Sequence, residues 1–345
     1  MIVFKRIAEF LFILLLASGI VFNEMVVYGI QQGYNQAKII WNARPIDEVI
    51  ADKNFPDSLK PKLRLIQEIR KFAFDSLGIN YSGNYTTFFN QQGKTLVWVV
   101  TACEPYQFKA KEWWFPVLGN VPYKGFFDRE KADGQAEELI LQGYDVDIGR
   151  IGGWSTLGWF KDPILSNMLN NSEGELADLI IHELTHGTLY VKDSASFNEN
   201  LASFIGHKGA VKFLQYRYGK NSKEDSTYME NRIDEKLFNE YILNGKQKLD
   251  SLYKNFTDTL SDVAKNKAKM NVIEKILKGL DSPSCYTIGR YKYYAQKALK
   301  SKNAFFMSFQ RYDAKQDDIE KEFREKFNSD VKQYLQYLKS KYPSL

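Results

Sequence analysis

Apolar residues recur at helical spacing over much of the chain. In Asp57–Leu77 they fall three and four positions apart, which predicts an amphipathic helix. Gln31–Trp41 has a similar pattern and should end before Arg44-Pro45, since proline disfavours helix in the residue before it. From Ser172 onward nearly every segment has helical spacing. One apolar stripe in that part predicts a single long helix through Leu249, Leu252, Phe256, Leu260, Val263, Met270, Ile273 and Leu277.

The central region has strand character. Thr95–Thr101 is rich in β-branched and aromatic residues, and Trp113–Val121 is similar but is broken by Pro116 and Gly119. A helix is predicted at Arg129–Gln142 and a strand at Tyr144–Ile151. We therefore expect an α+β fold that is predominantly helical and contains a small mixed sheet. The expected segments are 1–30, 31–171 and 172–345, with one domain over 31–345 as the alternative.

The first thirty residues differ from ordinary globular sequence. Lys5 and Arg6 precede the apolar run Phe10–Phe22, and apolar residues continue on both sides of it. This pattern favours an uncleaved signal anchor, a single transmembrane helix over 1–30, rather than a removed signal peptide. The basic pair should stay in the cytoplasm. We therefore expect the lipid bilayer of an inner membrane as one partner, with the rest of the chain on the extracytoplasmic side.

Composition narrows the function classes. The formal charge of +5 comes from 47 basic and 42 acidic residues spread along the chain, whereas nucleic-acid proteins gather a basic patch. Nucleic-acid binding is therefore not expected. Cys103 and Cys285 are the only cysteines, too few for a disulfide framework. Whether these two pair or remain thiols is left open by the sequence.

The strongest chemical signal is the segment His182-Glu183-Leu184-Thr185-His186, which contains two of the three histidines in the chain. Ser172 and Glu175 have the spacing of a capping box, so a helix should begin at Glu173 and carry this motif. Histidines four positions apart share one helical face and can chelate one zinc ion. Glu183 lies beside that face and is the candidate general base, taking a proton from water activated by the metal.

A catalytic zinc site needs a third protein ligand. Glu199 is the first candidate, because small residues share its face of the predicted helix Phe197–Tyr218 and would let two helices approach closely. The other reading of Glu199 is a capping box with Ser196. His207 is the runner-up; it lies about 80° around the helix from Glu199, so both should not bind one ion.

The combination of His182-Glu183-x-x-His186 with Asn198-Glu199-x-x-Ala202 resembles the gluzincin metallopeptidases. More specifically, it resembles a family of predicted bacterial membrane-associated aminopeptidases. Further segments that resemble this family extend over most of the chain: 43–46, 121–127, 155–160 with Asp162-Pro163, 190–193 and Asn303-Ala304. The resemblance implies one Zn²⁺ held by His182, His186 and Glu199, with Glu183 as the base.

The chain departs from the resemblance in three places. Many relatives have a lipoprotein cysteine after the apolar segment, whereas no cysteine precedes Cys103 here. Related gluzincins often place an acid four residues after the ligand glutamate to orient a histidine, and here that position is Ser203. Asp193 is a candidate for that orienting role. The amine-recognising G-x-M-E-N segment of better-studied aminopeptidases is absent.

Substrate-binding residues are less well marked. Gly152–Leu157 could pair as an edge strand with a peptide backbone, with Gly153, Trp154, Ser155 and Thr156 in contact, although a plain loop is an equal alternative. An oxyanion formed in peptide hydrolysis needs a hydrogen-bond donor. The candidates are Tyr190, Tyr286, Tyr291 and Tyr312.

The sequence therefore predicts a membrane-anchored zinc peptidase, an aminopeptidase in the first instance, with a small mixed sheet beside a zincin-type active-site helix and a helical C-terminal part. Its partner would be a peptide substrate. Two alternatives stay open at this stage: an endopeptidase, and a membrane-tethered scaffold whose metal site has no catalytic role.

Overall fold

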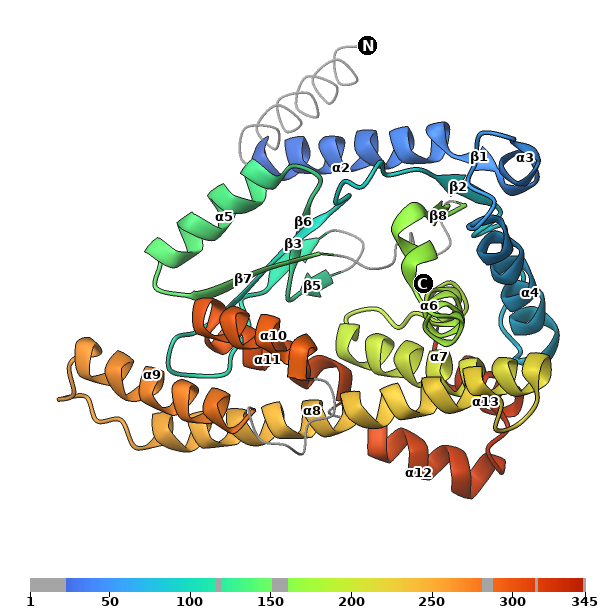
Figure 1. Cartoon of the computed structure of the whole chain (residues 1–345). Helices are drawn as coiled ribbons and strands as arrows, with labels where there is room; N and C mark the ends of the chain where they lie inside the picture. The colour runs from blue at the N-terminus through green and yellow to red at the C-terminus, as the bar shows by residue number, and fades with distance from the viewer. Residues whose placement is uncertain (1–22, 116–118, 151–160, 281–287, 314–315, 344–345) are drawn as a thin grey trace, which may run out of the picture. The chain divides into compact units, whose positions relative to one another are not determined.

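A computed structural model describes residues 23–115, 119–150, 161–280, 288–313 and 316–343 (Figure 1). The chain divides into two compact units after Ala43. In the first unit the described residues form α2 (Asn23–Asn42), which ends where the Arg44-Pro45 stop is predicted. Within the described ranges, no helix combines the length and apolar character needed to cross a bilayer. The predicted anchor run Phe10–Phe22 lies outside these ranges.

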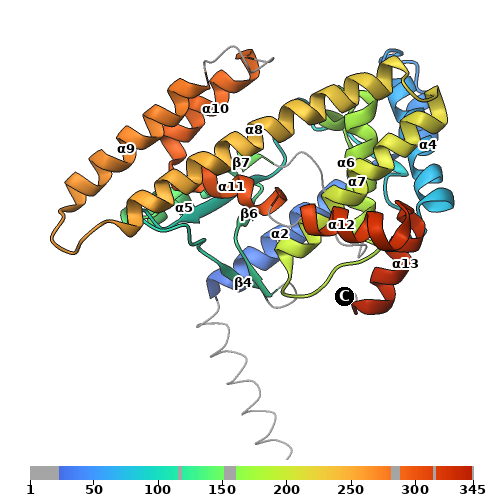
Figure 2. The ribbon, with the colours of Figure 1, turned by 90° about the horizontal axis from the view of Figure 1, so that it is seen from below.

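Helices dominate the second unit, residues 44–345, which confirms the predominantly helical α+β fold (Figures 1 and 2). The helices are α3 (Ile46–Ala51), α4 (Lys60–Ser76), α5 (Arg129–Leu141), η1 (Ser166–Asn170), α6 (Glu173–His186), α7 (Ala195–Tyr218), α8 (Lys223–Lys254), α9 (Asp262–Gly279), α10 (Ile288–Ser301), α11 (Asn303–Asp313), α12 (Gln316–Phe327) and α13 (Val331–Lys341). The strands are β1 (Arg44–Pro45), β2 (Thr87–Phe89), β3 (Trp98–Cys103), β4 (Trp113–Phe115), β5 (Gly119–Val121), β6 (Lys124–Phe126), β7 (Asp145–Arg150) and β8 (Ile164–Leu165).

The described strands form small sheets. In the order β1-β2-β8, the first pair is antiparallel and the second parallel, so this sheet is mixed as predicted. In the order β6-β3-β7 both pairs are antiparallel, and β3 aligns with β7 from Trp98 opposite Arg150 to Cys103 opposite Asp145. The sheets are short, and helices make up most of the second unit.

The strand character predicted for Trp113–Val121, interrupted by Pro116 and Gly119, is confirmed as two short strands. The segment contains two strands, β4 and β5, which pair antiparallel with Trp113 opposite Val121. The chain therefore reverses direction between Phe115 and Gly119. Gly119 has a φ of +74°, a backbone conformation that favours glycine, so the glycine that weakens the strand pattern belongs to the reversal.

The prediction of one long helix through Leu249–Leu277 is wrong. Helix α8 ends at Lys254 and α9 begins at Asp262, where the Ser261 hydroxyl caps the new helix by accepting a hydrogen bond from the Ala264 amide. The two helices lie side by side (Figures 1 and 2). Their apolar residues share one buried cluster, which includes Leu249, Ile273 and Leu277. The predicted apolar stripe is present, but it is divided between two helices that pack against each other.

The largest core joins the region before residue 171 to the helices after it. Leu63, Ile66 and Ile69 of α4 pack in one cluster with Ile180 of α6 and residues of α7, α12 and α13. The predicted helix Asp57–Leu77 is thereby confirmed as α4, with its apolar face inward. This core holds α6 and α7 as rigid elements, on which a site can be built.

Candidate metal centre

Helix α6 begins as the sequence predicts. The Ser172 side chain accepts a hydrogen bond from the Glu175 amide, and the Glu175 carboxylate accepts one from the Ser172 amide. Leu176, Ile180 and Leu184 are buried on one side of the helix. His182 and His186 occupy a neighbouring face one turn apart, near the end of the helix, and their Nε2 atoms are 3.2 Å apart.

Glu199 reaches these histidines from the second helix. Helix α7 starts at Ala195 with Ser194 as its N-cap residue, so Glu199 lies within the helix and the capping-box reading with Ser196 is wrong. The loop between the two helices is held by Asn198, whose amide group both donates to the Val191 carbonyl and accepts from the Val191 amide.

The three predicted ligands converge. The Glu199 carboxylate oxygens lie 3.6 Å from Nε2 of His182 and 3.6 Å from Nε2 of His186. A tetrahedral zinc ion with bonds near 2.0–2.1 Å would place its ligand atoms roughly 3.3 Å apart. The donor set of two imidazoles and one carboxylate therefore fits zinc in spacing as well as in chemistry. The side chains of His182, His186 and Glu199 are 17%, 7% and 24% exposed, so the centre is largely buried, with His182 and Glu199 partly exposed.

Small residues on α7 permit this convergence. A Cβ atom placed on Gly206 would lie 2.5 Å from Asp178 Oδ1, 2.9 Å from the Asp178 carbonyl oxygen and 3.1 Å from His182 Cβ. Such distances are too short for a side chain, so α6 and α7 approach more closely than an alanine would allow. The prediction that small residues bring Glu199 to the histidines agrees with this contact.

Glu183 is enclosed beside the ligands. Burial raises the pKa of its carboxyl to about 7; the positive charge that His182 can carry opposes this shift, whereas the charges of Glu199 and Asp162 add to it. A carboxyl group whose pKa lies near 7 can accept and return a proton at neutral pH, which is the property required of a general base.

Two residues near Glu183, Tyr85 and Asp162, were not predicted to be site residues. Burial raises the pKa of the Tyr85 hydroxyl, and the charges of Glu183 and Asp162 raise it further, so all three groups are within electrostatic reach of one another. Asn84 fixes Asp162 through two hydrogen bonds, donating to its carboxylate at 3.3 Å and accepting from its amide at 3.2 Å. Asp162-Pro163 belongs to the family resemblance, whereas no sequence signal singles out Tyr85.

The two candidate ligand histidines differ in the direction of their pKa shifts. Burial lowers the pKa of His186 to about 4. Burial also pushes the pKa of His182 down, but hydrogen bonding to Glu199 and the charges of Glu183 and Asp178 outweigh it, so that pKa is raised. A histidine has to be neutral to bind a metal, and the low pKa of His186 favours that form at neutral pH.

His207, the runner-up ligand, lies outside the cluster. Its Nδ1 atom is 3.1 Å from the hydroxyl of Tyr228. Burial lowers the pKa of His207 to about 3, and the positive charges of Arg232 and Lys208 contribute to this shift. His207 lies about 80° around α7 from Glu199, and this rotation also separates it from the metal centre.

Of the oxyanion candidates, the structure describes the Tyr190 side chain near the ligands. Its ring centroid is 6.0 Å from that of His186. Tyr286 and the substrate-binding candidates Gly153, Trp154, Ser155 and Thr156 lie outside the described residues, as do the side chains of Tyr291 and Tyr312.

Asp193, the orienting candidate, contacts a different element. It is exposed, and its carboxylate lies against Gly119 of β5, so that a Cβ atom on Gly119 would collide with it. Asp193 therefore lies against the β4–β5 hairpin.

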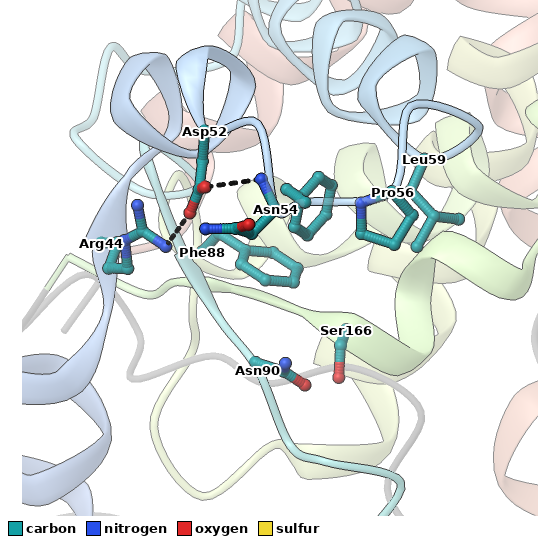
Figure 3. A pocket seen from close by; sticks show the side chains of 9 residues that line it. Arg44, Asp52, Asn54, Pro56, Leu59, Phe88, Asn90 and Ser166 are labelled. Atoms are coloured by element: carbon teal, nitrogen blue, oxygen red, sulfur yellow. Dashed lines mark hydrogen bonds and ion pairs between the residues drawn. The ribbon is translucent and has the colours of Figure 1, made fainter.

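A pocket of about 270 Å³ lies beside α3 and the β1-β2-β8 sheet (Figure 3). Arg44 and Asp52 form an ion pair at 2.8 Å, and the Asp52 carboxylate also accepts from the Asn54 amide. The rings of Phe55 and Phe88 meet edge to face beside them. None of the candidate metal ligands lines this pocket, so it is not the space in front of the metal centre.

Comparison with known proteins gives one match. The model of the Aminopep family, described as "Putative aminopeptidase", matches residues 27–341, which include both ligand-bearing helices. No match was found among curated proteins or among solved structures.

Proposed function

The chain belongs to the Aminopep family, and from this membership we propose that it is a zinc-dependent peptidase. In the proposal, His182, His186 and Glu199 hold one Zn²⁺ and Glu183 is the general base. The observation that carries it is the convergence of the three ligand atoms, all within 4.8 Å of one another, directly beside the enclosed carboxyl of Glu183.

A zinc ion in this position would polarise the scissile carbonyl and lower the pKa of a water molecule. The carboxylate of Glu183 would accept a proton from the attacking water and return it to the nitrogen of the leaving amine. Tyr190 would donate a hydrogen bond to the oxyanion. Burial and the Glu199 charge raise the pKa of its hydroxyl, which therefore stays protonated and able to donate.

We propose an aminopeptidase rather than an endopeptidase because the family description gives that activity. The gluzincin assignment within the peptidases rests on the two motifs around His182 and Glu199. A panel of peptides with free and acetylated N-termini tests both points. The full-length protein should contain one zinc and cleave only the peptides with free N-termini, and Glu183→Gln should abolish cleavage while retaining zinc.

The matched control is Glu137→Gln on α5, an exposed glutamate outside the metal centre, which should cleave like the wild type. Cleavage of acetylated peptides would identify an endopeptidase instead. Equal activity in wild type and Glu183→Gln would contradict the mechanism, and bound zinc without peptidase activity would favour the scaffold alternative.

We also propose that residues 1–30 anchor the chain in the bacterial inner membrane with the metal centre on the extracytoplasmic side. The support is the order of Lys5, Arg6 and the apolar run Phe10–Phe22. Protease added to spheroplasts should then digest the chain up to its anchor. Full protection of a C-terminal tag would contradict this orientation.

A further inference from the structure

A histidine that binds a metal uses one ring nitrogen for the metal and normally donates the N–H of the other to an acceptor in the protein. This second contact fixes which nitrogen carries the proton and how the ring is turned. In His182, Nε2 is the atom that faces Glu199 and His186. The second hydrogen bond, which would orient the ring, is therefore made by Nδ1.

Among the described residues, Ser203 places its side chain beside Nδ1 of His182. Its Oγ atom lies 3.5 Å from Nδ1 of His182. Ser203 follows Glu199 by one helical turn on α7, so the same helix provides one metal ligand and the support of another. The close approach at Gly206, one further turn along, brings the short serine side chain within reach of the ring.

No hydrogen bond joins His182 to Asp178 or Asp193 among the residues that the structure describes, although the charge of Asp178 raises the pKa of His182. The carboxylate of Asp178, one turn before His182, accepts a hydrogen bond from the Tyr228 hydroxyl at 2.6 Å. Asp193 lies against Gly119. His186 differs from His182, because its buried Nδ1 atom has no hydrogen-bond partner among the residues that the structure describes.

We propose that Ser203 is a positioning residue of the metal centre: its hydroxyl oxygen accepts the hydrogen bond from Nδ1–H of His182 and keeps the Nε2 lone pair directed at the metal. The inference rests on the proposed zinc site. A hydroxyl is a weaker acceptor than a carboxylate, and unlike a carboxylate it orients the ring without a charge of its own.

The test compares two substitutions of equal shape, Ser203→Thr and Ser203→Val, which differ in the hydroxyl group alone. Zinc affinity is measured on the full-length protein by competition with a chromophoric chelator. The threonine variant should bind zinc within about threefold of wild type. The valine variant and Ser203→Ala should bind it about 10–100-fold more weakly, which is the usual effect of losing such a partner. Ser196→Ala, an exposed serine on the same helix, is the control and should not change the affinity.

Metal-free unfolding separates positioning from a role in the fold. Alanine is a better helix former than serine, so the metal-free Tm of Ser203→Ala should equal or exceed that of wild type while its zinc affinity falls. With Co²⁺ in place of zinc, the visible spectrum of the valine variant should shift and that of the threonine variant should not. If the wild type binds zinc, and the threonine and valine variants have equal zinc affinities and equal Co²⁺ spectra, this inference alone is overturned. A wild type that binds no zinc overturns it together with the proposed function.

Discussion

The side chain of Asn198 makes two hydrogen bonds to the backbone of Val191: it donates to the carbonyl at 2.7 Å and accepts from the amide at 2.8 Å. Asn198 is 1% exposed and immediately precedes Glu199. The loop that follows His186 is thereby closed on the first turn of the helix that carries the third ligand. The asparagine of the Asn198-Glu199 motif thus has a structural role that can be separated from metal binding itself.

Replacing Asn198 with alanine should weaken both the fold and the site. It leaves two part-buried backbone groups of Val191 without this partner, and leaving a buried group unsatisfied costs about 1–3 kcal/mol. The free energy of unfolding, measured with chelator present, should fall by that order, and zinc affinity should fall with it because Glu199 loses its fixed position. Asn120→Ala, an exposed asparagine on β5, should change neither quantity. Unchanged unfolding of Asn198→Ala would show that the loop is held by other contacts.

Glu199→Ala and His207→Ala should separate the two candidate third ligands. Only Glu199 lies with both histidines, whereas His207 contacts Tyr228. The Glu199 variant should therefore lose stoichiometric zinc and the His207 variant should keep it, as measured by metal analysis after gel filtration. The opposite pattern would reverse the ligand assignment.

Gly206→Ala tests the close contact of α6 and α7. The added methyl group would press on Asp178 and His182. Overpacking of this kind destabilises by about 1–3 kcal/mol, although alanine is the better helix former. Gly134→Ala is a matched control inside α5, where an added Cβ meets no atom within 4 Å. It should stabilise by up to about 1 kcal/mol. Denaturant unfolding of the two variants should give changes of opposite sign.

These contacts mark how far the sequence predicts the site. His182, His186 and Glu183 follow from local helix geometry, and Ser172 and Glu175 begin their helix as the capping box requires. Glu199 follows from the next helix and its small residues. Tyr85 and Asp162 do not, because tertiary packing alone brings residues so distant in the sequence to Glu183.

The helical hairpin of α8 and α9 was not predicted, although its apolar residues were. The apolar spacing from Leu249 to Leu277 remains in helical phase across the break, so periodicity gives no sign of it. The capping signal at Ser261-Asp262 marks the start of α9, but it is weak beside the stripe. What decides the fold is that α8 and α9 can bury this stripe against each other.

Stability should fall in mild acid through His207. Burial holds its pKa at about 3 in the folded protein, whereas an exposed histidine in the unfolded chain has a pKa near 6.5. Below about pH 6.5 the unfolded state binds a proton that the folded state does not. The free energy of unfolding is therefore unaffected by His207 above that pH and falls as the pH is lowered. The slope is up to about 1.4 kcal/mol per pH unit. His207→Gln should flatten the dependence of unfolding free energy on pH between 6 and 4. An identical slope in the two proteins would show that His207 is not protected from protonation.

The buried ion pair of Lys269 and Asp145 joins the sheet to the C-terminal helices. Lys269, on α9, is 1% exposed, and it also donates to the Pro105 carbonyl at 2.8 Å. The Asp145 carboxylate, on β7, accepts from the Asn303 amide at 3.0 Å. Lys269→Met removes the buried positive charge and leaves this carboxylate with Lys302, whose Nζ atom is 4.0 Å from Asp145 Oδ1, as its remaining cation. Breaking one side of such a pair costs about 3–5 kcal/mol.

The double variant Lys269→Met/Asp145→Asn should recover part of that loss, because a neutral amide needs no counter-charge and its carbonyl oxygen can still accept from Asn303. A double-mutant cycle by denaturant unfolding measures the coupling. Zinc affinity of the folded variants should stay at the wild-type value, since neither residue belongs to the metal cluster or contacts its ligands in the described structure. Additive losses in the cycle would mean that the two side chains stabilise the junction independently of each other.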